Sequence, residues 1–329
     1  MTTLWDTTGS AVVKALAAER RSAGSVSSGL ALTLVVVVDE KNVAAAEAAA
    51  THAAAQHPCR LLVVVRRRPD APEPRLDAEV LIGGRLGPGE AVVMRMYGRL
   101  ALHAESVVLP LLAPDAPVVT WWYGEPPDKI AHDPLGVFAE RRITDCSLAP
   151  DELAALRGRA DDYAPGDTDL GWTRTTLWRA LCASAFDSVE GPVRSAKVSG
   201  APGHVTRALL AGWLSSRLGI SVQQVDAEGT GLSEVELVLD DVTLTIARGK
   251  ETGVLKRTGQ ADRTLPLPRR VLGELLAEEL RRLDPDEPYA EALEAATGTK
   301  GLSDRSPQRT HEWHDPMDSD DPDPALTVS

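Results

Sequence analysis

The N-terminal third of the chain alternates between apolar runs and helix-favouring stretches. Residues 30–38, LALTLVVVV, are almost continuously apolar and rich in β-branched side chains, which is typical of a strand buried on both faces of a parallel sheet. An alanine-rich stretch at 42–57 predicts a helix, and RLLVVV at 60–65 predicts a second strand. Strand, helix and strand with short joints form a βαβ unit, whose crossover we expect to be right-handed.

Shorter patterns of helical or alternating periodicity extend this first unit. They predict helices at 10–21 and 100–109, a hairpin of strands at 78–84 and 90–98, a strand at 118–124, and the end of a helix that enters a strand at 138–145. Together these elements predict an N-terminal α/β domain over residues 1–148. We expect it to contain a mixed sheet with βαβ units and flanking helices.

A second strand–helix–strand pattern occurs after residue 150, and the apolar period then falls to two. The predicted elements are helices at 151–159 and 172–186, a βαβ unit at 193–225, four alternating strands between 235 and 267, and helices at 271–283 and 289–296. Asp169 is the expected N-cap of the second helix. These elements predict a C-terminal α/β domain over residues 149–299, with an antiparallel meander.

The end of the chain differs in composition from the rest. From Leu302 onward, seven acidic residues stand against two arginines, and four prolines interrupt the segment. Such a segment has too few apolar side chains to offset the entropy of ordering. We therefore predict that residues 300–329 form a disordered acidic tail.

Charge and cysteine content exclude several classes of protein. The net charge is −13, which argues against binding to nucleic acid or to an anionic membrane surface. No apolar run approaches the roughly 20 residues of a spanning helix, and no secretory signal is evident. Three widely spaced cysteines do not suggest a disulfide framework, so we expect a reducing, cytoplasmic location.

Searches for catalytic motifs find no complete pattern. The glycine cluster at 83–89 lies between two predicted strands, so a turn explains it better than a phosphate cradle. No GxSxG motif occurs, and Cys182 lies in an apolar helical pattern that predicts a buried, inert thiol. His311 and His314 form only a weak ligand cluster in the tail. We therefore predict no catalytic residue, no cofactor and no metal site.

Tryptophan and arginine form the one constellation that stands out. Aromatic residues make up 4% of the chain, yet seven are tryptophans. Adjacent strand residues point to opposite faces, so one tryptophan of the WWY strand end can be core, while the other needs a helix, a second domain or a partner. Packing between domains, an intermolecular surface and a ligand stack are the alternatives. The candidate partner-binding residues are Trp121, Trp122, Arg141, Arg142, Trp172 and Arg174.

Several long strings resemble one known family. They are HPCRLLVVV at 57–65, residues 95–127 ending in WWYGEPP, DPLGVFAERRITD at 133–145, YAPGDTDLGWTRTTLWRALC at 163–182, and residues 263–293. These strings closely resemble the actinobacterial OpcA family of glucose-6-phosphate dehydrogenase assembly proteins. The resemblance covers nearly the whole chain outside the tail, and no catalytic motif accompanies it.

The resemblance implies a non-catalytic assembly factor and allosteric activator of glucose-6-phosphate dehydrogenase, in the oxidative pentose phosphate pathway. Cyanobacterial relatives are described as redox-responsive through C-terminal cysteines, but the last cysteine here is Cys182, so that switch is not carried over. The alternative is a metabolite- or nucleotide-binding sensor or enzyme. Its ligand would lie at the carboxyl ends of the N-domain strands, in the loops after Val38, Val65 and Tyr123.

Overall fold

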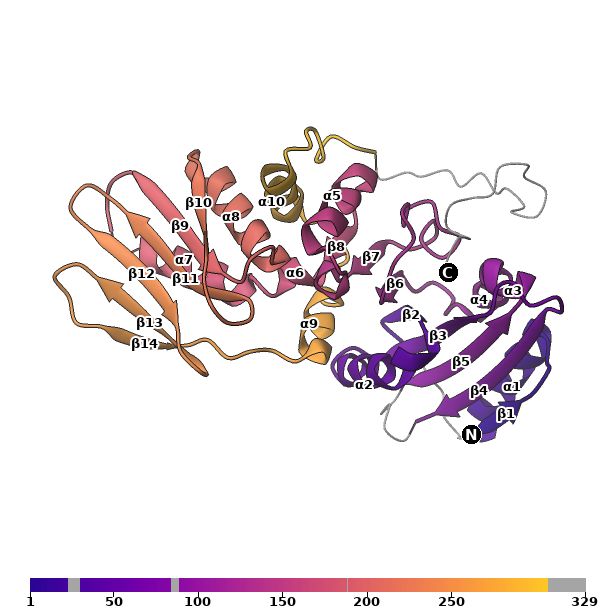
Figure 1. The fold of residues 1–329 in the computed structure, drawn as a ribbon. Coiled ribbons are helices and arrows are strands. Elements are labelled where there is room, and N and C mark those ends of the chain that lie inside the picture. The colour runs from indigo at the N-terminus through magenta and orange to yellow at the C-terminus, as the bar shows by residue number, and fades with distance from the viewer. Residues whose placement is uncertain (23–29, 84–88, 188, 307–329) are drawn as a thin grey trace. The chain divides into compact units, whose positions relative to one another are not determined.

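A computed structural model describes residues 1–22, 30–83, 89–187 and 189–306. The described chain divides into two compact units, coloured along the sequence in Figure 1. Unit 1 contains Met1–Thr144 and Leu272–Asp284, with Ser306, and unit 2 contains Asp145–Val271 and Pro285–Arg305. The protein is α/β in class, as the sequence predicts. The domain limits at 148 and 299 stay a prediction.

Unit 1 combines seven strands with short and long helices. In chain order the elements are β1 (Thr2–Leu4), α1 (Gly9–Ser22), β2 (Leu32–Val38), the 3-10 helix η1 (Glu40–Asn42), α2 (Val43–Ala54), β3 (Cys59–Arg67), β4 (Arg75–Ile82), β5 (Glu90–Tyr97), α3 (Arg99–Leu102), α4 (Glu105–Val108), the 3-10 helix η3 (Leu109–Leu111), β6 (Val118–Tyr123), β7 (Arg141–Thr144) and α9 (Leu272–Glu279).

The strands of unit 1 form a mixed sheet in the order β1-β4-β5-β3-β2-β6-β7. The five strands from β5 to β7 in this order run parallel, whereas β4 runs antiparallel to both of its neighbours. The predicted βαβ unit is β2-α2-β3, and the predicted hairpin is β4-β5. The turn of that hairpin, residues 84–88, lies outside the described residues.

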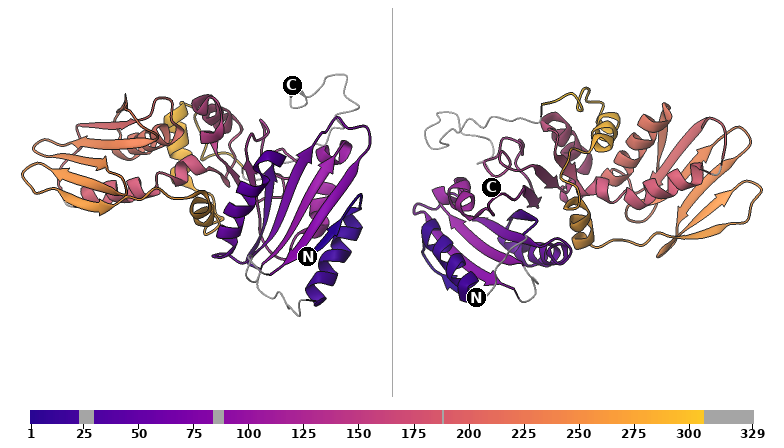
Figure 2. Two further views of the ribbon diagram at one scale, coloured as in Figure 1. Left: turned by 60° about the horizontal axis from the view of Figure 1, so that its bottom comes forward. Right: turned by 180° about the vertical axis from the view of Figure 1, so that it is seen from behind.

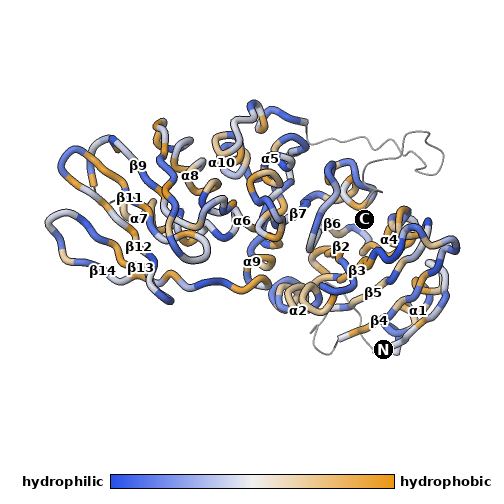
Figure 3. The backbone as a smooth tube through the Cα atoms, viewed as in Figure 1, coloured by the Kyte–Doolittle hydropathy of each residue, from blue (hydrophilic) through white to orange (hydrophobic). Residues whose placement is uncertain are grey.

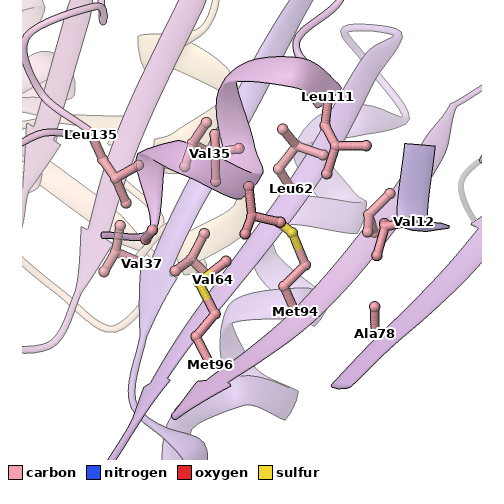
Figure 4. Close-up of a cluster of buried hydrophobic side chains, with 14 of the residues drawn as sticks. Val12, Val35, Val37, Leu62, Val64, Ala78, Met94, Met96, Leu111 and Leu135 are labelled. Atoms are coloured by element: carbon pink, nitrogen blue, oxygen red, sulfur yellow. The ribbon is translucent and has the colours of Figure 1, made fainter. Parts of the chain in front are cut away.

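The core of unit 1 lies on both faces of β2 and β3. Every residue of β2 is buried, because α1 and α2 cover opposite faces of the sheet (Figure 2). On the α1 side, Val12 packs with Leu62, Val64 and Met94 in the cluster of Figure 4. The apolar character of β2 and β3 is visible along the tube in Figure 3. This two-sided burial explains why their sequences do not alternate.

Unit 2 has a second sheet and the remaining helices. In chain order the elements are the 3-10 helix η4 (Cys146–Leu148), α5 (Glu152–Asp162), β8 (Asp167–Asp169), α6 (Leu170–Thr173), α7 (Thr176–Phe186), β9 (Ser195–Gly200), α8 (Val205–Leu218), β10 (Val222–Asp226), β11 (Leu232–Val238), β12 (Thr243–Arg248), β13 (Thr252–Arg257), β14 (Arg263–Pro266) and α10 (Glu287–Thr297).

The second sheet has the order β10-β9-β11-β12-β13-β14. Only β9 and β10 pair in parallel, and α8 connects them, so the predicted second βαβ unit is confirmed. The other strands form the predicted antiparallel meander. Trp178 of α7 and Leu210 of α8 pack on the same face of the sheet, together with Val198 and Val235.

Two predicted helices of unit 1 differ from the structure. The helix expected at 100–109 is divided among α3, α4 and η3. No helix precedes β7 in the described segment 124–140, which consists of turns. Pro126, Pro127 and Pro134 lie in this segment and cannot donate the backbone hydrogen bonds of a helix interior. The prediction that a helix leads directly into the strand at 138–145 is therefore wrong.

Two features at the C-terminal end bear on the predicted domain limits. The sequence places the helix at 271–283 in the second domain, but α9 packs on α2 and belongs to unit 1. Its amphipathic pattern shows which face is apolar, but not which core covers that face. Within the segment predicted as a tail, Leu302 is buried and Arg305 donates to the carbonyls of Ala160 and Tyr163. The rest of the predicted tail lies outside the described residues.

Candidate functional site

Both tryptophans of the β6 pair are core residues of this chain. Trp121 and Trp122 are 0% and 1% exposed. Trp122 packs with Ile130 and Leu135 from the turns that follow β6, and Trp121 lies 5.1 Å from the ring of Tyr123. Neither indole N–H has a hydrogen-bond partner among the described residues. Opposite faces of β6 are therefore both covered by the chain itself, and neither tryptophan is left exposed for a partner.

Arg141 and Arg142 begin β7 and are buried as well. The Nε of Arg141 donates to the Glu279 carboxylate of α9 at 3.0 Å, a second guanidinium nitrogen also contacts it, and Nη1 donates to the carbonyl of Asp284 at 3.0 Å. Arg142 donates to the carbonyl of Ala139 at 2.6 Å. The sequence predicts a solvated or partner-binding arginine pair, but the structure uses both to hold unit 1 together.

Trp172 and Arg174 are tied into unit 2 in the same way. The indole of Trp172 donates to Asp286 at 2.8 Å, and the guanidinium of Arg179 lies 3.6 Å from the centroid of its ring. Arg174 binds both carboxylate oxygens of Asp145, at 2.7 and 2.6 Å, and its side chain is 29% exposed. The six candidate residues thus form no exposed patch in the described chain, and their part in binding a partner stays a prediction.

A buried carboxylate organises the start of α6. The helix expected at 172–186 is divided into α6 and α7, so Asp169 is the N-cap of α6, whereas Thr175 precedes α7. Asp169 accepts hydrogen bonds from the amides of Gly171 and Cys146, both at 2.8 Å. Burial, together with the nearby Asp145 carboxylate, raises the pKa of Asp169. Because the Asp169 carboxylate is fully buried and accepts from backbone amides, it fixes a turn of the chain. It is not placed to exchange protons with a substrate.

The N-terminus of α8 is occupied by a carboxylate of the protein. In a βαβ unit this position, after β9, is the usual place for a bound phosphate. Here Glu152 of α5 accepts from the amide of Val205 at 2.8 Å. The Nδ1 of His204 accepts from the amide of Thr206 at 3.1 Å, and burial lowers the pKa of this histidine. The first free amides of the helix are therefore already paired, and unit 2 offers no nucleotide cradle here.

The three thiols are buried and poorly ionised, as the sequence predicts for Cys182. Burial raises the pKa of Cys59 and of Cys182 to about 12, and burial with the nearby Asp169 raises that of Cys146 well above its usual range. Because the thiolate is the reactive form, we expect alkylation of the native chain to be at least about 100-fold slower than in urea. Mass spectrometry after timed iodoacetamide treatment measures this. Rapid native labelling of any of the three would contradict the burial.

Metal-ligand groups and membrane-spanning helices were sought among the described residues. Residues 1–22, 30–83, 89–187 and 189–306 contain no group of three or more metal-ligating His, Cys, Asp or Glu side chains. His311 and His314 lie outside the described residues. Among the described helices, none combines the length and the apolar character that crossing a bilayer requires.

The loops of the alternative hypothesis do follow adjacent strand ends. Val38 of β2 pairs in register with Val65 of β3 and with Tyr123 of β6. Gly124 lies beside Asp39, since a Cβ on this glycine would be 3.7 Å from the Asp39 carboxylate. The loop after β2 therefore brings an acid to this edge of the sheet, which disfavours an anionic ligand at that point.

An arginine row at the same edge was missed by the sequence reasoning. Arg67 of β3, Tyr97 of β5 and Arg75 of β4 are cross-strand neighbours. The guanidinium carbons of Arg67 and Arg75 lie 5.4 and 5.7 Å from the centroid of the Tyr97 ring, and that of Arg68 lies 6.0 Å from it. The signal in the sequence is the run of three arginines at 66–68, directly after a buried strand.

Comparisons with solved structures give distant similarities. They include the 3-ketoreductase KijD10 of Actinomadura kijaniata, with 12% identity and a TM-score of 0.45 over 82% of this chain and 95% of that one. The UDP-N-acetylglucosamine 3-dehydrogenase GnnA of Acidithiobacillus ferrooxidans has 12% identity and a TM-score of 0.41, over 82% and 96%. Biliverdin reductase of Synechocystis has 12% identity and a TM-score of 0.39, over 82% and 98%.

Comparisons with sequences are more specific. A search of curated proteins finds no match. The family model described as the glucose-6-phosphate dehydrogenase subunit N-terminal domain matches residues 50–161. The model described as the C-terminal domain of the same subunit matches residues 165–293. Because the two matches follow one another and together cover most of the chain, this protein belongs to the OpcA family of glucose-6-phosphate dehydrogenase assembly proteins.

Proposed function

We propose that this protein is a non-catalytic assembly factor that binds glucose-6-phosphate dehydrogenase in the cytoplasm and activates it allosterically. The observation that carries the proposal is the pair of family matches, at 50–161 and 165–293. The role would place the protein in the oxidative pentose phosphate pathway, where the dehydrogenase supplies NADPH.

The chemistry of the described residues supports a non-catalytic role. The Glu152 carboxylate occupies the amides at the start of α8, where a cofactor phosphate would otherwise bind. The thiols of Cys59 and Cys182 have pKa values raised to about 12, which makes them poor nucleophiles at neutral pH. The buried Asp169 holds backbone amides. Each of these groups has a structural use that leaves it unsuited to catalysis.

Activation without catalysis requires only a difference in binding. A protein that binds the productive oligomer of the dehydrogenase about tenfold more tightly than the inactive form shifts the equilibrium by about 1.4 kcal/mol. A modest interface is sufficient for this difference. The chain carries a net charge of −13. If charged residues lie at the rim of the interface with the dehydrogenase, we expect the rate of association to depend on the salt concentration.

Titration of the full-length protein into purified glucose-6-phosphate dehydrogenase tests the proposal. We expect the sedimentation coefficient of the dehydrogenase to rise and its turnover at fixed substrate to increase, both saturating at one molar ratio. An unrelated protein of similar net charge controls for ionic effects. The protein alone, mixed with glucose 6-phosphate and NADP⁺, should produce no NADPH. Unchanged sedimentation and turnover would contradict the assembly role, and NADPH formation by the protein alone would contradict the non-catalytic one.

One observation favours the second candidate function, a metabolite-binding sensor. It is the arginine row at the carboxyl edge of the unit 1 sheet, which includes Arg67, Tyr97 and Arg75. Ligand binding at that row is compatible with an assembly role, because a bound metabolite can change the affinity for a partner.

A further inference from the structure

We propose that the carboxyl edge of the unit 1 sheet binds the phosphate group of a small phosphorylated metabolite. The site consists of Arg67, Arg68 and Arg75, arranged around Tyr97. Binding of a phosphate compound at this site can be tested without the dehydrogenase.

Strand register creates the site. Tyr97, the last residue of β5, lies between Arg67 on β3 and Arg75 on β4. Since β4 runs antiparallel to β5, the first residue of β4 comes to the same edge as the last residues of β3 and β5 (Figure 1). Cross-strand neighbours project from the same face of a sheet, and all three guanidinium carbons lie within 6.0 Å of one ring centroid.

The three guanidinium groups keep donors for a ligand. Arg68 is exposed and has no carboxylate partner among the described residues. Arg75 contacts Asp77 at 2.9 Å, and Arg67 contacts Glu40 at 3.3 Å and donates to the Tyr97 hydroxyl at 2.6 Å. A guanidinium has five N–H donors, so these contacts leave several free on each side chain. The side chains of Arg67 and Arg75 are 36% and 47% exposed, which leaves them accessible.

The loop that presents Arg68 is held in a costly conformation. Arg68 has a φ of +37°, which L-residues other than glycine rarely adopt. Its carbonyl accepts from the amides of Ala71 and Gly98, at 3.0 and 3.1 Å. Gly98 has a φ of +57°, and a Cβ there would lie 2.7 Å from the carbonyl oxygen of Ala71. Such strain persists where the surrounding structure enforces it, and it is concentrated at binding sites.

A phosphate fits this edge better than a single carboxylate does. Planar guanidinium groups pair with phosphate oxygens in bidentate fashion, and a dianion gains from several of them at once. Arg67 and Tyr97 lie at the carboxyl ends of the parallel strands β3 and β5, and open α/β sheets bind small ligands outside the carboxyl ends of their parallel strands. Of the acids next to the row, Glu40 contacts both Arg67 and Arg95, and Asp77 contacts Arg75. The chain as a whole carries a net charge of −13, so non-specific attraction of an anion to its surface is weak.

Calorimetric titration of the full-length protein at constant ionic strength tests the proposal. Inorganic phosphate, glucose 6-phosphate and glucose serve as probes. We expect saturable binding of one or both phosphate compounds and none of glucose. Arg68→Ala should weaken the binding of these phosphate compounds about tenfold, because it removes one charge-assisted bidentate contact. Arg68→Lys should weaken it less, because lysine keeps the charge. Arg21→Ala, an exposed arginine at the end of α1, is the matched control and should leave the affinity unchanged.

Each outcome decides the question. Absence of saturable binding of both phosphate compounds up to roughly 10 mM would overturn the site. Equal weakening by Arg21→Ala and Arg68→Ala would show non-specific attraction, and glucose binding as tightly as glucose 6-phosphate would exclude phosphate recognition. If glucose 6-phosphate binds more tightly than inorganic phosphate, the result supports a phosphate ester as the ligand. If the two compounds bind equally tightly, the result supports a site that recognises the phosphate group alone. Because the dehydrogenase is absent, a failure here leaves the assembly role untouched.

Discussion

Replacing Arg141 by alanine is expected to lower the free energy of unfolding by about 3–5 kcal/mol. Arg141 is 3% exposed, and its guanidinium contacts the equally buried Glu279 carboxylate and the Asp284 carbonyl. Removal of the cation takes away the guanidinium that contacts the buried Glu279 carboxylate, and the poorer compensation of this desolvated charge accounts for most of the loss. Urea denaturation of the full-length protein, followed by far-UV circular dichroism, measures the change.

A second ion pair of the same chain supplies the control. Arg194 binds Asp240 at 2.7 Å, but both side chains are about 60% exposed, so Arg194→Ala should leave the unfolding midpoint unchanged. The double variant Arg141→Met with Glu279→Met should recover most of the loss, because it removes both buried charges. A loss in Arg141→Ala no larger than in Arg194→Ala would show that the Arg141 pair is solvated.

The alternating and continuous apolar patterns were sufficient for most of the fold. The run at 30–38 is apolar on both faces because α1 and α2 cover both faces of β2. The meander after β10 alternates because only one of its faces is packed against α7 and α8. In each case the periodicity reports how many faces are buried, which is a local property of the sequence. The helix at 271–283 shows the limit, because its periodicity does not identify the surface that it covers.

The candidate site depended on information that the sequence does not contain. Tryptophan and arginine are enriched both in protein interfaces and in buried networks, so their presence alone does not distinguish the two. The partner of Arg141 is Glu279, which lies 138 residues further along the chain. Only the fold brings these two side chains together, and the burial of the pair follows from that contact.

The arginine row was missed for a related reason. The run at 66–68 is visible in the sequence, and a charge run after a strand is usually a solvated loop. Its significance arises from Tyr97 and Arg75, which belong to two other strands and become neighbours only through the register of β3, β5 and β4. A shift of one residue in that register would place these side chains on opposite faces of the sheet.

Trp122→Ala is expected to lower the free energy of unfolding by about 3–5 kcal/mol, because it empties a large volume in the core of unit 1. The indole packs against Ile130 and Leu135, and a Cβ at Gly136 would lie 3.3 Å from the ring. Trp122→Phe should cost less, since an aromatic ring still fills part of the volume and the indole N–H has no partner among the described residues to lose. Chemical denaturation again provides the measurement.

Trp5→Ala separates packing from binding. Trp5 is 68% exposed, so its removal should change the unfolding free energy by no more than about 0.5 kcal/mol. If Trp122 were an interface anchor, which is one of the alternatives that the sequence leaves open, its alanine variant would remain as stable as Trp5→Ala and would instead bind the dehydrogenase more weakly. A stability loss confined to Trp122→Ala assigns this tryptophan to the fold, so that a contact surface for the dehydrogenase has to be sought among exposed side chains.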